Sequence, residues 1–183
     1  MNSPVVSVLL PARNAAATLD RAMRSILSQS LRELELVAVD DGSTDGTRAL
    51  LGVFAATDPR GRVLAGGGRG LVAALNLGRL HCRAPYLARM DADDESLPER
   101  LARSVQALQA DASLCAVGTQ VEIFRDDRPV SPNMAAYGRW LNSLTTPERL
   151  FTERFVESPL CHPSVTLRRE ALEEVGGFRD GEL

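Results

Sequence analysis

Lysine is absent from this sequence of 183 residues, in which the 21 Lys+Arg positions are all arginine. A phosphate-binding loop of the GxxxxGK[ST] type is therefore excluded, because that loop needs a lysine. Positive charge is also scarce: the 24 acidic residues leave a formal net charge of -3. We expect no general nucleic-acid binding, which would require a basic face. Any phosphate group must be bound by guanidinium, whose planar fork matches phosphate oxygens.

Cysteines and long apolar runs are scarce too. Cys82, Cys115 and Cys161 lie far apart without CxxC spacing, so neither a zinc site nor a disulfide framework is indicated. A reducing cytosol suits this composition, and we expect a cytoplasmic protein. No apolar run approaches the ~20 residues that span a bilayer, and the N-terminus does not resemble a signal peptide. We expect no transmembrane segment in this chain and leave open a peripheral association of a longer protein with the inner membrane.

Short apolar runs alternate with segments of helical periodicity, a pattern typical of an α/β protein. The predicted strands cover residues 5–10, 34–39, 63–65, 86–90 and 115–124. The helices between them are predicted to begin at Leu19, near Ser43 or Thr44, at Leu71 and near Pro98. This order implies right-handed crossovers and a mainly parallel sheet flanked by helices.

Single residues predict some boundaries and close contacts. Pro11 is expected to end the first strand and Thr18 to cap the first helix, and Gly78 should let the third helix approach the sheet closely. After residue 124 the periodicity fades, and we predict a long, partly ordered excursion over residues 125–146. A short helix at 147–155, a strand at 164–167 and a helix at 168–175 complete the predicted elements.

The fourth predicted strand runs into the acidic stretch Asp91-Ala92-Asp93-Asp94. Carboxylates this close repel one another, and a divalent cation with oxygen ligands would relieve the repulsion. The alternative is a solvated loop in which Asp93 or Asp94 caps the helix that Pro98 opens.

Two further polar segments follow neighbouring strands. Asp40-Asp41 ends the second strand, and a glycine loop over residues 66–70, with Arg69 in it, ends the third. The loop does not fit the GxGxxG dinucleotide pattern. In an open parallel sheet, ligands bind in the crevice beyond the carboxyl ends of the strands. That crevice should therefore combine carboxylates, a glycine loop and a guanidinium, which suits a nucleoside diphosphate held through a metal.

Six short segments, in this order along the chain, resemble the inverting glycosyltransferases of family 2, which have the GT-A fold. They are Val6-Ser7-Val8-Leu9-Leu10-Pro11-Ala12-Arg13-Asn14, Ile26-Leu27-Ser28-Gln29-Ser30, Val39-Asp40-Asp41-Gly42-Ser43-Thr44-Asp45, Gly70-Leu71 with Ala74-Leu75-Asn76, Asp91-Ala92-Asp93-Asp94 with Pro98, and His162-Pro163-Ser164-Val165 with Gly176-Gly177-Phe178. The resemblance covers nearly the whole chain. It implies one GT-A domain over residues 1–183, with a nucleotide half of about 1–124 and an acceptor-side segment of about 125–183.

The resemblance also implies roles for the polar residues. Pro11 and Asn14 would lie beneath the nucleotide, and Asp41 would accept the base N–H. Asp91-Ala92-Asp93 matches the DXD motif of the family, so carboxylates from the set Asp91, Asp93 and Asp94 would ligate Mn²⁺ or Mg²⁺ and approach the ribose.

This sequence departs from the family pattern at two positions. Arg13 stands where the family often has an aromatic residue, and Ala74-Leu75-Asn76 stands where ARN is common. The phosphate-side arginine is therefore expected to be Arg69, Arg13 or Arg89. His162, in the acceptor-side strand of the family, would contact the acceptor or would simply be a packed or capping histidine.

An inverting transfer needs a general base, and in this family it is a carboxylate somewhat after the GGF segment. We expect that base beyond Leu183, with Glu182 as a weak candidate, and therefore expect a truncated, inactive donor half. The expected activity is transfer of a sugar from a UDP- or dTDP-sugar to a hydroxyl of a saccharide, lipid-linked or protein acceptor. The alternatives are a nucleotide-binding or regulatory module without turnover and a sugar-phosphate nucleotidyltransferase.

Overall fold

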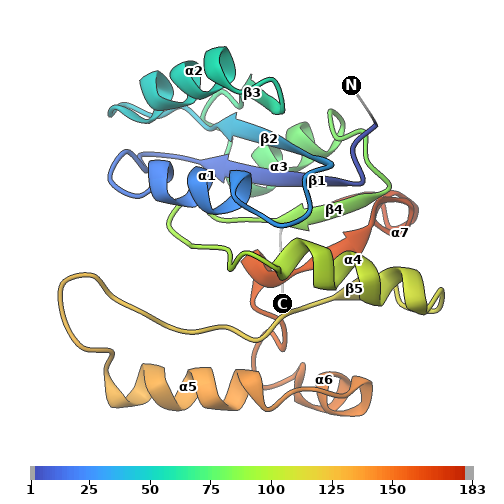
Figure 1. Cartoon of the computed structure of the whole chain (residues 1–183). Coiled ribbons are helices and arrows are strands. Elements are labelled where there is room, and N and C mark those ends of the chain that lie inside the picture. The colour runs from blue at the N-terminus through green and yellow to red at the C-terminus, as the bar shows by residue number, and fades with distance from the viewer. Residues whose placement is uncertain (1–2, 180–183) are drawn as a thin grey trace.

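The computed structural model describes residues 3–179, which form a six-stranded sheet flanked by helices (Figure 1). The strands are β1 (Val6–Ala12), β2 (Leu34–Asp40), β3 (Gly61–Ala65), β4 (Tyr86–Arg89), β5 (Ala116–Val117) and β6 (Thr166–Arg168). Their order across the sheet is β3-β2-β1-β4-β6-β5, and the first four are mutually parallel. β6 is antiparallel to both β4 and β5. The predicted mainly parallel sheet is confirmed.

Helices cover both faces of this sheet. They are α1 (Leu19–Leu27), α2 (Thr47–Thr57), α3 (Leu71–Arg79), α4 (Arg100–Ala110), α5 (Pro132–Asn142), α6 (Pro147–Glu153), α7 (Arg169–Glu174) and a short 3₁₀ turn, η1 (His162–Ser164). Buried side chains of α1, α2 and α4 form one core against the sheet, and those of α3 and α7 form the core on the other face. Among residues 3–179, no helix is both long enough and apolar enough to cross a bilayer.

Pro11 does not end β1, contrary to the prediction. Leu9 accepts a hydrogen bond from the Met90 N–H on the β4 side, and Ala12 accepts one from the Asp41 N–H on the β2 side. Backbone polar groups alternate sides along a strand, so the nitrogen of Pro11 points toward β4 beyond the last paired residue, Leu9. No ladder hydrogen bond is lost there, and the strand continues through the proline.

The predicted strand over residues 115–124 is wrong for most of its length. β5 contains only Ala116 and Val117, and β6, the one strand of residues 3–179 that pairs with it, is itself three residues long. Farther along, the backbone of Val121 is paired with a side chain instead. Its N–H donates to Asn142 Oδ1 over 2.8 Å, and its carbonyl accepts from Asn142 Nδ2 over 2.7 Å.

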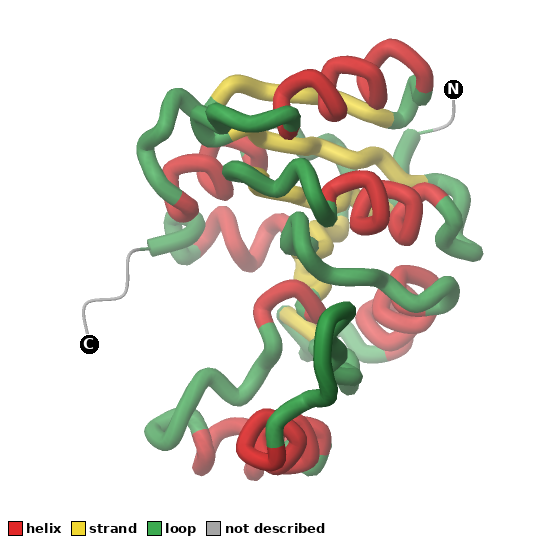
Figure 2. Tube along the Cα trace, turned by 90° about the vertical axis from the view of Figure 1, so that its left-hand side faces the viewer, coloured by secondary structure: helices red, strands yellow, loops and turns green. Residues whose placement is uncertain are grey.

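α5 was not predicted, since residues 125–146 were expected to be irregular. A signal was present: Ser131 accepts a hydrogen bond from the Met134 N–H, and Pro132 occupies the first turn. α5 carries an aromatic pair, Tyr137 and Trp140, with ring centroids 5.7 Å apart and ring planes tilted by 31°. Figures 1 and 2 show α5 and α6 standing apart from the sheet.

α2 also begins later than predicted, at Thr47. The Thr47 N–H donates to Asp45 Oδ1 over 3.0 Å, so Asp45 orders this start. Ser43 and Thr44, the predicted start, are engaged with Asn14 instead. At the first helix, Thr18 holds the predicted position before Leu19 but makes no side-chain cap hydrogen bond.

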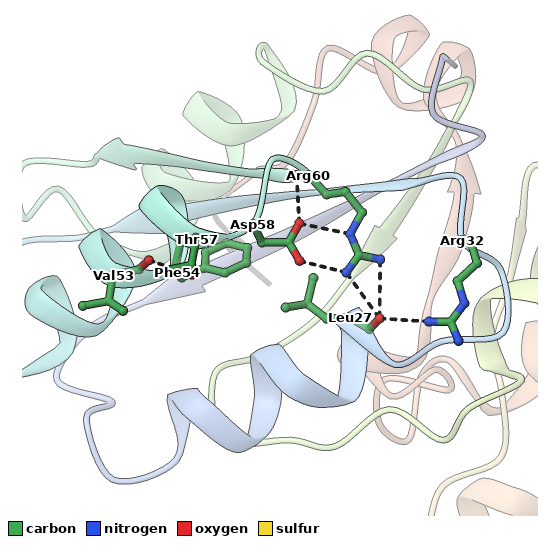
Figure 3. A network of polar contacts seen from close by, with 7 residues as sticks. All are labelled: Leu27, Arg32, Val53, Phe54, Thr57, Asp58 and Arg60. Atoms are coloured by element: carbon green, nitrogen blue, oxygen red, sulfur yellow. Dashed lines mark hydrogen bonds and ion pairs between the residues drawn. The ribbon is translucent and has the colours of Figure 1, made fainter. Parts of the chain in front are cut away.

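Two arginines donate hydrogen bonds to the last carbonyl of α1 (Figure 3). The Leu27 carbonyl accepts from both terminal nitrogens of Arg60 and from Arg32, each over 3.4 Å. Arg60 is held by Asp58, whose Oδ2 lies 2.8 Å from its Nη2. Cations at this end complement the helix dipole, so this contact fixes α1 against the loop before β3.

Gly78 lets α3 pack closely on the sheet, as predicted. A Cβ atom at this position would overlap Leu9 Cδ1 and lie 3.0 Å from Val39 Cγ2.

We expect Gly78→Ala to lower the free energy of unfolding by about 1–2 kcal/mol, because overpacking outweighs the gain in helix propensity. The matched control is Gly52→Ala in α2, where a Cβ meets nothing within 4 Å. Urea unfolding should show the control unchanged or stabilised; equal stability of the two variants would contradict this packing argument.

A buried glutamate connects β2 to β1 and to the loop before β4 at the amino ends of these strands. Glu35 is 3% exposed and accepts hydrogen bonds from Ser7 Oγ over 2.6 Å and from the Arg83 N–H and Nε over 2.6 and 2.8 Å. Burial alone would raise the pKa of Glu35, but these hydrogen bonds outweigh burial and hold it below its ordinary value of 4.5.

We expect Glu35→Gln to lower the free energy of unfolding by about 1–2 kcal/mol at neutral pH, because charged acceptors bind more strongly than neutral ones. A lowered folded-state pKa contributes stability above the unfolded pKa and loses it as the pH falls through the folded pKa. The gap between the parent and the variant should therefore be constant above about pH 6 and shrink below pH 4.5. A gap that is independent of pH down to acid unfolding would contradict the role of the charge.

Candidate active site

The carboxyl ends of the parallel strands meet at one edge of the sheet, and a pocket of about 280 Å³ opens there. It is lined by Pro11, Arg13, Asn14, Ala15, Thr18, Leu71, Arg89, Asp91, Ala92 and Asp93. The structure thus brings together six predicted site residues from the ends of β1 and β4 and the loops that follow them: Pro11, Arg13, Asn14, Arg89, Asp91 and Asp93. Ala15, Thr18 and Leu71 were not predicted to line the site.

Four other predicted site residues do not line this pocket: Asp41, Arg69, Asp94 and His162. Glu182, the weak candidate for the general base, lies outside the described residues.

Asn14 sits in a strained backbone conformation at the pocket. Its φ is +51°, the only positive φ of a non-glycine residue within residues 3–179. Asn14 Oδ1 accepts from the Thr44 N–H over 2.8 Å, and the Asn14 N–H donates to Ser43 Oγ over 3.1 Å. Residues in sparsely populated conformations persist where the surroundings fix them. Asn14 therefore locks the loop after β1 to the loop after β2.

Asp41 holds the glycine loop in place. The side chain is buried, with Oδ1 accepting from the Arg69 N–H and Oδ2 accepting from the Gly70 N–H, both over 2.9 Å. Gly42 lies so close to the same loop that a Cβ there would be 3.1 Å from Gly68 Cα. A carboxylate has about four acceptor sites, so Asp41 keeps capacity for a further donor, such as a base N–H.

Arg13 lines the pocket, and Arg69 lies in the glycine loop that Asp41 holds. The Arg69 side chain is exposed and its Nε donates to Gly66 O over 3.2 Å. Arg13 is also exposed, and its Nη1 lies 4.0 Å from Asp41 Oδ2. Both guanidinium groups are accessible from solvent, and of the two only Arg13 lines the pocket.

Arg89 and Asp91 form an ion pair inside the pocket. Arg89 Nε donates to Asp91 Oδ1 over 3.2 Å, and Arg89 Nη2 donates to Oδ2 over 3.4 Å. The Arg89 side chain is 12% exposed and that of Asp91 is 30% exposed. Both Asp91 oxygens therefore have a guanidinium partner in the free protein.

The other two aspartates of the acidic stretch differ in exposure. Asp93 is exposed, and within residues 3–179 its carboxylate makes no hydrogen bond or ion pair. Asp94 is half-buried, and burial together with the negative charges of Asp93 and Asp91 raises its pKa to about 6. α4 begins only at Arg100 and has no side-chain cap, so neither aspartate caps this helix, and the capping prediction is wrong.

Arg100 is a buried residue that supports the acidic stretch through hydrogen bonds. This guanidinium is 8% exposed, donates from Nη2 to the Arg89 carbonyl over 2.7 Å, and donates from Nη1 to Ser96 Oγ over 3.5 Å. Burial lowers its pKa to about 10, so it remains protonated at neutral pH. Arg100 was not predicted from the sequence. Its partners are backbone and hydroxyl groups on both sides of the acidic stretch, and these groups come together only in the folded protein.

The donor set in the pocket fits a shared metal rather than an all-protein metal cage. No group of three or more His, Cys, Asp or Glu side chains among residues 3–179 is arranged to hold a metal ion. Mg²⁺ is typically held by one or two carboxylates, with substrate phosphates and water supplying the other ligands. Asp91 and Asp93 satisfy that requirement, since both line the pocket.

His162 opens η1, outside the pocket. It is exposed, and its Nε2 lies 3.3 Å from Ser158 Oγ. η1 packs beside β4, and Val165, just after it, accepts a hydrogen bond from the Arg89 N–H over 2.9 Å. The segment that carries His162 therefore adjoins the acidic end of β4, although the imidazole itself contacts no pocket residue.

Comparison with known proteins agrees with this geometry. The family described as glycosyl transferase family 2 matches residues 7–176. The putative glycosyltransferase EpsE of Bacillus subtilis is 34% identical over 182 residues, which make up 98% of this chain and 62% of EpsE. The chondroitin synthase of Escherichia coli is 28% identical over 180 residues, 97% of this chain and 24% of that protein. This chain thus spans less than two thirds of either relative.

Solved structures show the same fold. The mannosyltransferase PcManGT of Pyrobaculum calidifontis, solved in complex with GDP-Man and Mn²⁺, aligns with a TM-score of 0.72 at 26% identity, covering 97% of this chain and 48% of its own. TarS 1–349 of S. aureus in complex with UDP-GlcNAc aligns with a TM-score of 0.68 at 18% identity, covering 97% and 49%. The sheet described above is the GT-A fold. With its family motifs in place over residues 7–176, this chain belongs to glycosyl transferase family 2.

Proposed function

We propose that this protein binds a nucleoside-diphosphate sugar in the pocket at the ends of β1 and β4, together with Mn²⁺ or Mg²⁺, and transfers the sugar with inversion to an acceptor hydroxyl. The observation that carries this proposal is the pocket itself. It places two carboxylates, Asp91 and Asp93, beside the guanidinium groups of Arg89 and Arg13. That combination suits a diphosphate whose charge is shared between a cation and arginines.

The chain supplies the binding groups for each part of the donor. Asp41, with two acceptor positions beyond its loop contacts, is suited to the base N–H, and Pro11 and Asn14, which line the pocket, would lie beneath the nucleotide. Asp91 and Asp93 would hold the divalent cation, with Asp94 close by. A cation bound there would supply positive charge to the leaving diphosphate. Arg69 and Arg13 are placed to screen phosphate charge.

The acceptor would approach from the side of η1, where His162 is exposed. We assign no general base among residues 3–179, and Glu182 lies outside them, so the donor half of the reaction is the part that these residues can carry. The acceptor hydroxyl would belong to a saccharide, a lipid-linked sugar or a protein. The proposed donors are UDP- and dTDP-sugars; GDP-sugars enter the test because PcManGT was solved with GDP-Man.

Isothermal titration calorimetry with UDP, dTDP and GDP, each with Mn²⁺ and with EDTA, tests the proposal. We expect one nucleotide to bind tightly, and only with the cation. Undiminished affinity in EDTA would contradict the metal site, and no binding of any of the three would contradict the donor site. With a longer protein that turns over, the anomeric configuration of the product, read by NMR, tests inversion.

A further inference from the structure

Arg89 is paired with a carboxylate that the proposed function assigns to the cation. Its side chain lines the pocket, is largely buried and donates hydrogen bonds to both oxygens of Asp91. Asp91 is one of the two pocket carboxylates available to a cation. A cation arriving at Asp91 therefore meets a positive charge already bound there. Like charges on one carboxylate oppose each other, so the ion pair disfavours a bare metal ion.

The backbone of Arg89 is fixed, whereas its guanidinium has a single protein partner. The Arg89 N–H donates to the Val165 carbonyl, and the Arg89 carbonyl accepts from Arg100. All of the hydrogen bonds that its guanidinium makes within residues 3–179 go to Asp91. The side chain can thus turn within the pocket without disturbing the sheet.

The other arginines near the site are less suited to exchange partners. Arg13 is 59% exposed and contacts Asp41 only at 4.0 Å. Arg69 donates to Gly66 O and does not line the pocket. Arg100 is buried and its terminal nitrogens are already bonded to backbone and hydroxyl groups. Arg89 alone among these four combines pocket lining, burial and a carboxylate partner that a cation would also use.

We propose that Arg89 is a positioning residue that exchanges partners: it neutralises Asp91 in the free protein and turns to the diphosphate when a divalent cation takes over the Asp91 carboxylate. This inference rests on the proposed function. The diphosphate supplies the negative charge that lets the cation and the guanidinium occupy one pocket together. Cation and nucleotide should therefore bind with positive coupling, and linkage requires that coupling to be reciprocal.

The test measures Mn²⁺ alone, and UDP and GDP with and without saturating Mn²⁺, by titration calorimetry on the whole chain. In Arg89→Met, Mn²⁺ alone should bind about tenfold more tightly, since its competitor is gone, while the nucleoside diphosphate with Mn²⁺ should bind about tenfold more weakly. Uridine and guanosine, which lack phosphate, should be unaffected. A residue that merely supports the fold would not shift the two affinities in opposite directions.

Two further variants keep the test decisive. Asp91→Asn frees the guanidinium without removing it, so UDP or GDP should bind several-fold more tightly in EDTA than to the parent. Arg103→Met removes one exposed arginine from α4, outside the pocket, and should change none of these affinities. Circular dichroism establishes that each variant is folded, and Asp91→Asn carries the test if Arg89→Met does not fold.

The outcomes distinguish the exchange of partners by Arg89 from the metal-dependent nucleotide binding on which it rests. Metal-dependent nucleotide binding by the parent, with Mn²⁺ affinity unchanged or weakened in Arg89→Met, would overturn the exchange and leave the proposed function standing. Failure of the parent to bind any nucleoside diphosphate would overturn both. Opposite shifts in Arg89→Met, absent in Arg103→Met, are the result that the exchange requires.

Discussion

Replacing Asp93 with alanine is expected to abolish most of the strengthening of nucleoside diphosphate binding by Mn²⁺. Asp93 is exposed in the pocket, and no described residue bonds its carboxylate. Asp91, in contrast, is already paired with Arg89. Asp93 is therefore the carboxylate that a cation reaches without displacing a protein group. The loss should be about 2–4 kcal/mol of the metal-dependent binding free energy, as for removal of a ligand carboxylate.

Calorimetry with and without Mn²⁺ measures this difference directly. The matched control is Asp127→Ala, which also removes one exposed carboxylate but lies in the irregular segment after β5. It should leave the metal effect intact. If Asp93→Ala retains the metal dependence of the parent, the ligand role belongs to Asp91 or Asp94 instead.

Asp41→Asn should have two separable effects. An amide offers one acceptor oxygen, whereas both Asp41 oxygens accept backbone N–H groups of the glycine loop. One loop N–H would then face the amide NH₂ group, and we expect a loss of about 1–3 kcal/mol in the free energy of unfolding. The base N–H would also lose a charged acceptor, so nucleotide affinity should fall by a further 1–3 kcal/mol or so.

Asp40→Asn is the control for Asp41→Asn, because it makes the same change one residue earlier at the same buried edge. Asp40 Oδ1 accepts from the Ser43 N–H over 3.0 Å rather than from the glycine loop. Thermal unfolding reports the first effect, and titration with the nucleotide and with the free nucleoside reports the second. Parental affinity for both ligands in Asp41→Asn would reduce Asp41 to a loop anchor.

The strands and helices of the parallel half could be predicted because their apolar residues follow the periodicity of buried elements. The residues of β1 and β2 are all buried, and Leu101, Val105 and Leu108 face the core as the pattern in α4 indicates. α5 lacks that pattern because it packs little against the sheet: Gly138 and Leu141 are its only buried residues. Its start is marked instead by Ser131 and Pro132, a signal that the prediction of an irregular segment did not use.

The candidate site could be predicted as a set of residues but not as a set of contacts. The carboxyl ends of parallel strands necessarily meet at one edge, so the gathering of Asn14, Asp91 and Asp93 follows from strand order. The partners of Asp41 are backbone N–H groups in a distant loop, which side-chain identities do not reveal. The same holds for Arg100, whose acceptors include the carbonyl of Arg89.

The fluorescence of Trp140 can be used to follow the unfolding of α5 without an added label. Trp140 is the only tryptophan in the sequence, and its ring contacts that of Tyr137 on α5, a helix that stands away from the sheet. Emission excited at the red edge of the absorption band therefore reports on α5 and its neighbours, whereas far-ultraviolet circular dichroism is dominated by the elements of the larger sheet core. In a denaturant titration, coincident curves from the two signals would show that both parts melt together, and separated curves would show that α5 opens as a local unit of lower stability.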